Sequence, residues 1–395
     1  MNRDPLPGRL RSALNRDRLV QTAKELIAVP SPTGQAGAVL DRAAEMLENA
    51  GFAVRRAAGG HESAPAVVAR FDSGEPGRVI QFDGHLDTVH LPFCPPRLEG
   101  DWLRGSGASD MKSGVAASIE AVRMLQESGL LKRGAVLLTL HDLHEAPWGR
   151  GEQLDRLIGE GIVGDGVLLP EPFCDHLPVA GRGAATWKVI LRRSGPPVHE
   201  VHRPADQPSV IAAGAELVRL LQDLDKRLQQ QVDPIAGRAS VFIGQFHSGE
   251  IYNQFPQEAM LEGTRRWLPG ASREAVEAEM RTLFDNLARD CGVEVDWEFR
   301  LIRDAFRLDL DSPLVTAFQR AYSAVVGQPL PTGPKPFVDD GNSFSALAGV
   351  AAITHGPRAG GQHTVDEWVS LDDLERVALV YALTAALFCD PAAQA

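Results

Sequence analysis

Residues 78–88 read RVIQFDGHLDT, and this stretch decides the fold class. Its first half is a short apolar run typical of a strand buried inside a sheet. His85 and Asp87 follow, and they alternate with Leu86, so both point to the same side of an extended chain. The pattern predicts a buried strand that delivers a histidine and a carboxylate to the edge of a sheet.

These two side chains suit a metal site. A histidine ligand needs an acceptor at its second ring nitrogen, which fixes the tautomer and raises the basicity of the ring. A carboxylate two residues later can supply that acceptor if the chain then bends. We therefore expect His85 to bind a metal ion and Asp87 to orient it. A lone His-x-Asp stretch is more often a solvated strand end, so the rest of the chain must support the assignment.

Three more apolar runs precede metal-competent side chains: residues 134–140 before His144 and Glu145, residues 166–169 before Glu171, and residues 350–354 before His363. Each run is too short to span a membrane and suits a parallel strand that helices cover on both faces. Ligands bind at the carboxyl ends of such strands. The runs therefore predict one hydrolytic site with two metal ions at that edge of the sheet.

Asp110 follows a glycine-containing loop, residues 104–109, and precedes the amphipathic residues 115–125. The glycines permit a tight backbone course, and the later residues predict a helix. At the start of this helix the carboxylate could be an N-cap that accepts hydrogen bonds from backbone N–H groups. A carboxylate can equally bridge two cations about 3.5–4 Å apart. The segment alone leaves both roles open.

The gap between Glu171 and His363 is 192 positions (363 minus 171), which is too long for a loop within a compact domain. A folded insertion is therefore expected. Within it, residues 185–192 alternate apolar and polar side chains, as a half-buried strand does. Residues 210–228 and 272–287 predict two helices.

Five motifs occur in a specific order: Gly-His-x-Asp at 84–87, Gly-x-Gly-x-x-Asp-Met-Lys at 105–112, a strand that ends in acidic residues by 145, Glu-Pro at 171–172, and Gly-x-x-His-x-x-Asp-Glu at 360–367. In this order the chain resembles the zinc amidohydrolase/exopeptidase family that includes glutamate carboxypeptidase, acetylornithine deacetylase and succinyl-diaminopimelate desuccinylase. The resemblance extends from about residue 26 nearly to the C-terminus.

The resemblance implies an α/β fold with two domains. A phosphorylase/hydrolase-like catalytic domain with a mostly parallel sheet would comprise residues 1–184 and 303–395. A smaller α+β lid domain, residues 185–302, would be inserted in it and would form the interface of a homodimer.

The resemblance also implies a ligand set for two divalent metal ions, with zinc expected and cobalt or manganese as alternatives. His85 and Glu171 would hold one ion, Glu145 and His363 would hold the other, Asp110 would bridge them, and Asp87 would support His85.

The chain departs from this family at His144. Relatives carry two adjacent acids, the first as general base and the second as ligand. If Glu145 is aligned with the family's ligand, the set of metal ligands is complete and His144 takes the position of the general base. If the alignment is shifted by one residue, Glu145 becomes the base and Ala146 occupies the position of the ligand. We favour the first alignment, with His144 as base or substrate-orienting group, because a neutral imidazole can accept a proton from water whose pKa metals have lowered. A structural role for His144 and His141 is the alternative.

Three residues of the insertion are further candidates by resemblance. His199 matches a lid histidine that reaches the partner subunit's active site and stabilises the oxyanion; the usual serine pair after it is replaced, and His202 or a plain surface role are alternatives. Asn253 and Arg266 match residues that grip a substrate carboxylate, for which a guanidinium is well shaped. Arg265 is expected to be a solvated strand charge.

Length and composition predict a soluble globular protein with two domains: the chain has 395 residues, of which 44% are apolar and 23% charged. The net charge of −12 and the lack of a basic patch argue against a nucleic-acid partner. No apolar stretch approaches the ~20 residues of a membrane span, and the N-terminus lacks the apolar region of a secretory signal. Four scattered cysteines suit reduced thiols, so cytoplasmic residence without a membrane partner is expected.

We expect hydrolysis of a C–N bond, an amide, in a small substrate that bears a carboxylate, such as an N-acyl amino acid or a dipeptide. The dinuclear centre would activate water, and His144 or Glu145 would move the proton to the leaving amine. The alternative is a homologue that binds metal ions and a small molecule but no longer hydrolyses it, because the usual catalytic acid is absent. The intact set of five metal ligands argues against this alternative. Residues 340–342 differ from the Thr-Asp pair that is usual in the family, so the substrate specificity of relatives is not assigned to this chain.

Overall fold

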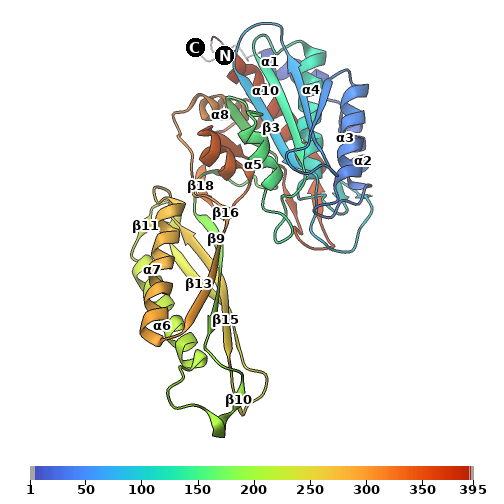
Figure 1. The fold of residues 1–395 in the computed structure, drawn as a ribbon. Helices are drawn as coiled ribbons and strands as arrows, with labels where there is room; N and C mark the ends of the chain where they lie inside the picture. Colours follow the sequence, from blue (N-terminus) through green and yellow to red (C-terminus); the bar gives the residue numbers. More distant parts are fainter. Residues whose placement is uncertain (1–4, 391, 393–395) are drawn as a thin grey trace. The chain divides into compact units, whose positions relative to one another are not determined.

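The computed structural model describes residues 5–390 and 392. Packing divides the chain into two units (Figure 1). The first comprises the residues up to Val179, Leu308–Gly333 and the residues from Asp339, and the second comprises Ala180–Arg307 and Pro334–Val338. The division into independently folding domains at residues 185 and 302 stays a prediction.

The first unit is built on a six-stranded sheet with the order β1 (Ala53–Ala57), β2 (Ala66–Asp72), β6 (Ala135–His141), β3 (Val79–His85), β7 (Gly166–Leu169) and β19 (Ala352–Thr354). The pairs β6–β3, β3–β7 and β7–β19 are parallel, and the pairs β1–β2 and β2–β6 are antiparallel. The expected α/β fold with a mostly parallel sheet is thus confirmed. All four apolar runs that predicted buried strands form neighbouring strands of this sheet.

Helices cover both faces of the sheet, which is why its central strands are apolar on both sides. On one face, the ring centroids of Phe82 in β3 and Tyr381 in α10 (Leu371–Cys389) lie 5.1 Å apart. On the same face, Val115 of α4 (Lys112–Ser128) packs against Gly84, where an added Cβ would lie 2.7 Å from its Cγ2. On the opposite face, Leu157 of α5 (Glu152–Gly159) joins the buried cluster of β2 and β6.

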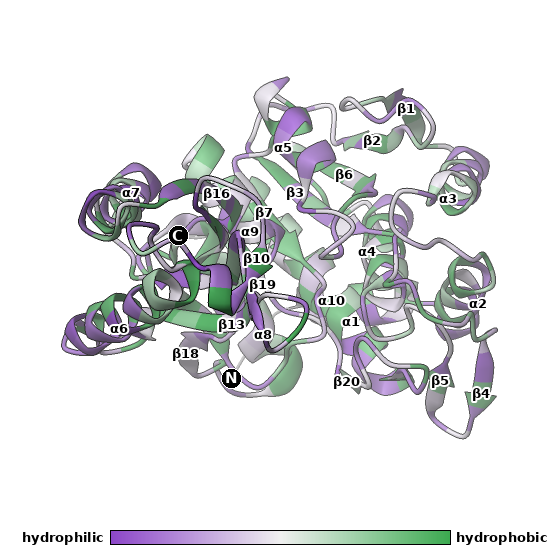
Figure 2. Ribbon diagram, turned by 60° about the horizontal axis from the view of Figure 1, so that its bottom comes forward, coloured by the Kyte–Doolittle hydropathy of each residue, from purple (hydrophilic) through white to green (hydrophobic). Residues whose placement is uncertain are grey.

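The other helices of this unit are α1 (Pro5–Ala13), α2 (Arg16–Ile27), α3 (Gly37–Asn49), α8 (Pro313–Val326), the short α9 (Asp340–Ser343) and the π-helical turn η2 (Phe344–Ala348). A second sheet has the order β20 (Ala359–Gly360), β21 (Trp368–Ser370), β5 (Trp102–Arg104) and β4 (Arg97–Glu99), and a third has the order β17 (Phe306–Arg307), β8 (Leu177–Gly181) and β18 (Thr332–Lys335). Figure 2 shows hydrophobic residues concentrated in the central strands and hydrophilic residues on the outer sides of α2 and α3.

The second unit is an antiparallel sheet with two helices on one face. Its strand order is β13 (Ser240–Ser248), β15 (Glu258–Trp267), β9 (Gly183–Arg192) and β16 (Glu294–Arg303), and its helices are α6 (Val210–Leu228) and α7 (Arg273–Cys291). Strand β9 alternates buried and partly exposed residues, as predicted for residues 185–192. Three short elements complete the unit: the pair β10 (Val198–His199) and β14 (Gln254–Phe255), the pair β11 (Val232–Asp233) and β12 (Gly237–Arg238), and η1 (Glu200–His202).

The expectation for Arg265 is wrong. Its side chain is 3% exposed, and one guanidinium nitrogen donates to Oε2 of Glu279 in α7 at 2.9 Å. Alternate residues of β15 face the helices, and Arg265 belongs to the buried set. Its neighbour Arg266 therefore points to the opposite face of the sheet.

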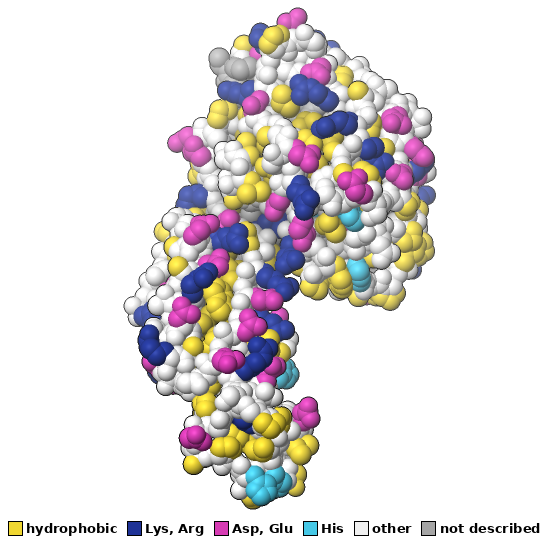
Figure 3. Space-filling view, in the orientation of Figure 1, with side chains coloured by type: hydrophobic (Ala, Val, Ile, Leu, Met, Phe, Trp, Pro, Cys, Tyr) yellow, Lys and Arg dark blue, Asp and Glu magenta, His cyan; other side chains and the backbone are white. Residues whose placement is uncertain are grey.

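Helices long and apolar enough to cross a membrane do not occur in the described part of the chain. On the face in Figure 3, lysine and arginine side chains are interspersed with aspartate and glutamate. The four cysteines all lie in the described part and form no disulfide.

Candidate metal centre

The carboxyl ends of neighbouring parallel strands bring the predicted ligands together. His85 is the last residue of β3 and pairs in register with His141, the last residue of β6. Glu145 follows β6 in the loop after it, and Glu171 follows β7. Because parallel strands end at one edge of the sheet, their loops share this edge.

His85 is fully buried, and its ring is held differently from the expectation. Nδ1 lies 3.1 Å from the main-chain oxygen of Asp87, and the carboxylate of Asp87 is 3.6 Å away. That carboxylate instead accepts backbone N–H groups of His144 at 3.1 Å and Glu145 at 3.0 Å. Buried amides need acceptors, so Asp87 fixes the loop after β6 while its own carbonyl orients His85.

The N-cap alternative for Asp110 is wrong. Helix α4 begins at Lys112, its N-cap residue is Met111, and no side chain caps it. Asp110 instead directs Oδ1 to within 3.2 Å of Nε2 of His85 and Oδ2 to within 3.5 Å of Nε2 of His363. One oxygen for each histidine is the arrangement that a bridging carboxylate requires.

His363 and Glu145 form the other half of the cluster. Nε2 of His363 lies 3.1 Å from Oε2 of Glu145. His363 adopts a φ of 58°, which is uncommon for a residue with a side chain and costs backbone strain. The hydrogen bonds to Asp110 and Glu145 raise the pKa of His363 to about 10.

Glu171 completes the cluster. Its Oε1 lies 3.8 Å from Nε2 of His85 and 3.8 Å from Nε2 of His144. Burial raises the pKa of Glu171 well above its usual value, and the nearby Asp110 adds to this. Burial alone would lower the pKa of His85, but Asp110 and Asp87 outweigh it and raise that pKa well above 6.5.

Two buried atoms of this cluster indicate that a cation belongs in it. Among the described residues, neither Nε2 of His85 nor Oε1 of Glu171 has a hydrogen-bond partner, so the 3.2 Å contact of His85 with Asp110 lacks hydrogen-bond geometry. Buried polar atoms in proteins are normally satisfied. The ligand atoms of His85, Asp110 and Glu145 lie within 4.8 Å of one another, and so do those of His85, His144 and Glu171. Imidazole nitrogens and carboxylate oxygens are the donors that zinc accepts, so His85, Asp110, Glu145 and Glu171 fit a metal centre, with His144 beside them.

His144 has a partner that the sequence did not reveal. Its Nδ1 lies 2.8 Å from Oδ2 of Asp340, and its ring stacks on His85 with centroids 3.9 Å apart and planes 6° apart. The same oxygen of Asp340 lies 3.3 Å from Nε2 of His141, which also lies 3.3 Å from Oδ2 of Asp83. The predicted base thus belongs to a chain of alternating carboxylates and imidazoles.

This chain of groups is buried and charged. Burial alone would lower the pKa of His141, but Asp83 and Asp340 raise it to about 10. Burial alone would raise the pKa of Asp340, but His144 and His141 hold it well below its usual value. No spacing rule connects His144 with Asp340, although both depart from the pattern of the resembled family.

Glu367 supports the cluster in a way that the sequence did not predict, since residues 363–367 were expected only to border the leaving-group side of the site. Its carboxylate accepts the backbone N–H groups of Gly107 at 3.2 Å, Ser109 at 3.1 Å and Asp110 at 3.2 Å. It therefore fixes the loop that presents Asp110. Burial, followed by the charge of Asp110, raises the pKa of Glu367 to about 7. Its position four residues after His363, in the last motif, was the available signal.

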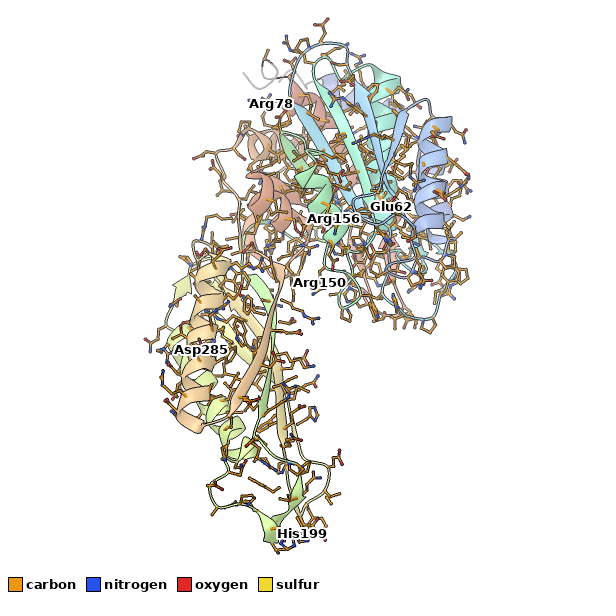
Figure 4. The ribbon with its side chains drawn as sticks, viewed as in Figure 1. Glu62, Arg78, Arg150, Arg156, His199 and Asp285 are labelled. Carbon is orange, nitrogen blue, oxygen red and sulfur yellow. The ribbon has the colours of Figure 1, made fainter. Side chains whose placement is uncertain are left out.

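The candidates of the insertion all lie in the second unit. Nδ2 of Asn253 lies 3.0 Å from Nε2 of His199, where β10 pairs with β14, and Figure 4 shows His199 at the end of β10. Nδ1 of His199 lies 3.3 Å from Glu200. Arg266 is partly exposed, and within the described chain it forms no ion pair with a carboxylate. Burial, with a contribution from Arg182, lowers the pKa of Arg266.

Comparisons with known proteins agree with this architecture. The model of peptidase family M20/M25/M40 matches residues 82–386. A succinyl-diaminopimelate desuccinylase of Cereibacter sphaeroides (strain ATCC 17029) is 27% identical over 382 residues, which cover 92% of this chain and 96% of that protein. One from Erythrobacter litoralis is 32% identical over 223 residues, 51% of this chain and 57% of that protein.

Solved structures share the fold. The aminopeptidase PepT from Bacillus cereus superposes with a TM-score of 0.78 at 19% identity, covering 95% of this chain and 99% of that one. Human carnosine dipeptidase 1 has a TM-score of 0.73 at 16% identity, covering 98% and 99%. The resemblance inferred from the five motifs is confirmed. Because the family model matches most of its length, the chain belongs to peptidase family M20/M25/M40 and is a metal-dependent hydrolase of amide bonds.

Proposed function

We propose that this enzyme hydrolyses the amide bond of a small substrate that carries a carboxylate, such as an N-acyl amino acid or a dipeptide. The observation that carries the proposal is the cluster around Asp110, which directs one oxygen to His85 and the other to His363. The relatives named as desuccinylases, which act on an N-acyl group, support this class of substrate.

Two divalent ions belong to the proposal, with zinc expected and cobalt or manganese as alternatives. The residues that would hold them are His85 and Glu171 for one ion, Glu145 and His363 for the other, and Asp110 for both. Cations bound there would polarise the amide carbonyl and lower the pKa of a nearby water molecule.

His144 is the residue that we assign to proton transfer. Its Nδ1 is engaged by Asp340, so Nε2 is the nitrogen that faces Glu171 and the rest of the cluster. Glu145 is the weaker candidate because its Oε2 is already in contact with His363 at 3.1 Å. His144 would accept a proton from water and pass it to the leaving amine.

In this proposal the second unit would supply substrate contacts and the interface of a homodimer. Arg266, near the end of β15 that pairs with Ala184, would bind the substrate carboxylate, because within the described residues its guanidinium forms no ion pair with a carboxylate. Asn253 lies beside His199, beyond the opposite end of β15, so it would contact the carboxylate of the substrate bound to the partner subunit. His199 would act on the substrate bound to the partner subunit. Exposed apolar side chains near it, at Val201 and Tyr252, support contact with a second copy.

Release of free amine from a panel of substrates tests this proposal. The panel contains N-acetyl and N-succinyl amino acids, dipeptides, and matched amides that lack the carboxylate, each assayed with zinc-loaded enzyme and with chelator. We expect chelator-sensitive release from the carboxylate-bearing members only. Silence across the panel from enzyme with two bound ions would instead favour a homologue that binds metal and ligand without hydrolysis.

A further inference from the structure

We propose that Asp340 is a positioning residue for His144: its carboxylate fixes the tautomer with the proton on Nδ1, so that the lone pair of Nε2 faces the metal cluster. This inference rests on the proposed hydrolysis, in which His144 transfers the proton.

The tautomer follows from hydrogen-bond chemistry. A neutral imidazole has a proton on one nitrogen only, and an ionised carboxylate can only accept. Nδ1 of His144 lies 2.8 Å from Oδ2 of Asp340, so the proton must be on Nδ1 for this contact to be a hydrogen bond. Nε2, which lies 3.8 Å from Oε1 of Glu171, is then the unprotonated nitrogen.

The surroundings of Asp340 keep its carboxylate ionised, so that it accepts hydrogen bonds. The side chain is fully buried, and its Oδ2 also faces Nε2 of His141 at 3.3 Å. His141 in turn faces Asp83 at 3.3 Å, so one imidazolium lies between the two carboxylates and offsets part of their negative charge. Asp340 begins α9, whose start is fixed by a capping box between Asp339 and Asn342. The carboxylate is therefore held by secondary structure as well as by its ion pairs.

Ring stacking argues that His144 is not itself a metal ligand. The lone pair of an imidazole nitrogen lies in the plane of its ring. The rings of His85 and His144 are stacked 3.9 Å apart with their planes only 6° from parallel. Two lone pairs in stacked parallel planes do not converge on one ion, so when His85 binds the ion, Nε2 of His144 stays available for a proton.

The proton balance is simple. One proton leaves water for Nε2 of His144 as the water oxygen attacks the carbonyl carbon, and Nδ1–H continues to donate to Asp340. The proton then leaves Nε2 for the amide nitrogen as the C–N bond breaks. The products are a carboxylic acid and an amine, and His144 returns to its first tautomer. Asp340 stabilises the transient imidazolium without taking the proton.

The experiment is ¹⁵N NMR of the zinc-loaded enzyme with labelled histidines, in which long-range proton–nitrogen couplings identify the protonated nitrogen. The signal of His144 is assigned by its loss in His144→Gln. We expect the Nδ1–H tautomer in the native enzyme. In Asp340→Asn, the amide can donate to Nδ1 instead, so we expect the Nε2–H tautomer and a fall in kcat on the order of 100-fold or more, with little change in KM.

Asp83→Asn is the matched variant, because it changes the same buried chain one imidazole farther from His144. Asp83→Asn should leave the tautomer of His144 unchanged and should lower kcat much less than Asp340→Asn does. Equal losses in both variants with an unchanged tautomer would overturn the proposal, since Asp340 would then act only through the fold. An Nε2–H tautomer in the native enzyme would also overturn it, and this measurement needs no variant to fold.

Zinc content separates this proposal from the proposed function. If His144→Gln binds one ion fewer, His144 is a ligand and the positioning role is wrong, while hydrolysis by the cluster stands. If the native enzyme holds two ions and the Nδ1–H tautomer but cleaves nothing in the panel, the proposed function fails while the contact with Asp340 is upheld.

Discussion

Oε2 of Glu145 lies 3.1 Å from Nε2 of His363, although 218 positions (363 minus 145) separate them in the chain. Glu145 follows β6 of the six-stranded sheet, His363 lies between β20 and β21 of another sheet, and the whole second unit lies between the two residues in sequence. Neither the segment with Glu145 nor the segment with His363 can form this half of the cluster alone. The metal centre therefore depends on the return of the chain to the first unit after the insertion.

Asp110→Asn should remove the bridge. An amide offers one oxygen with no charge, so it cannot serve both His85 and His363 as the carboxylate does. We expect loss of at least one of the two ions, measured by elemental analysis, and a fall in kcat/KM of at least about 100-fold, as a lost ligand should exceed the effect of a lost supporting residue. Asp285→Asn, on the outer side of α7 in Figure 4, is the control and should change neither. Two retained ions with native activity would refute the bridging role.

Glu367→Gln should weaken metal binding without removing a ligand. The loop from Gly107 to Asp110 donates three backbone N–H groups to Glu367, and a neutral amide accepts them less strongly. We expect metal affinity to fall roughly 10- to 100-fold in a chelator competition assay. Glu48→Gln, an exposed change in α3, is the control. An unchanged affinity would show that the loop holds its position without this carboxylate.

His141 gives a pH dependence of stability. Its pKa is raised from 6.5 to about 10 in the folded protein, so between these values the folded state binds more protons than the unfolded state. The stabilisation is fully present below pH 6.5 and is lost as the pH rises through 10. We expect the free energy of unfolding of the metal-free enzyme, measured in urea, to fall more steeply between pH 6.5 and 10 than that of His141→Gln. Parallel pH profiles would show that His141 is not charged in the folded protein.

Arg266→Ala should raise KM for substrates with a carboxylate. Hydrogen bonds to charged groups contribute about 1.5–3 kcal/mol, which corresponds to roughly a 10- to 150-fold change in binding. Matched amides without the carboxylate should be affected little. Arg300→Ala, an exposed change in β16 of the same sheet, is the control and should be near neutral. A uniform loss on both kinds of substrate would contradict carboxylate recognition by Arg266.

The central strands could be predicted because parallel strands covered on both faces have continuous apolar runs, which few other elements share. The runs before His85 and Glu171 are of this kind. His85, Glu145 and Glu171 were identifiable because each follows such a run, and the topology places the ends of β3, β6 and β7 at one edge of the sheet. The same reasoning predicted β9 from its alternation, since only one of its faces is covered by helices.

Other features depend on tertiary packing, which cannot be predicted from a local sequence pattern. Asp87 was assigned to the ring of His85, but the neighbouring loop supplies two buried amides that compete for its carboxylate. Arg265 was expected in solvent because arginine usually is, whereas the register of β15 places it under α7 beside Glu279. The contact between His144 and Asp340 joins residues 196 positions apart, and only the tertiary fold brings them together.

Anomalous diffraction at the zinc edge from crystals of the zinc-loaded enzyme would show directly whether two ions bind at Asp110. We expect two peaks about 3.5–4 Å apart, with Asp110 between them, His85 and Glu171 at one peak and Glu145 and His363 at the other. A single peak, or peaks away from Asp110, would contradict this expectation.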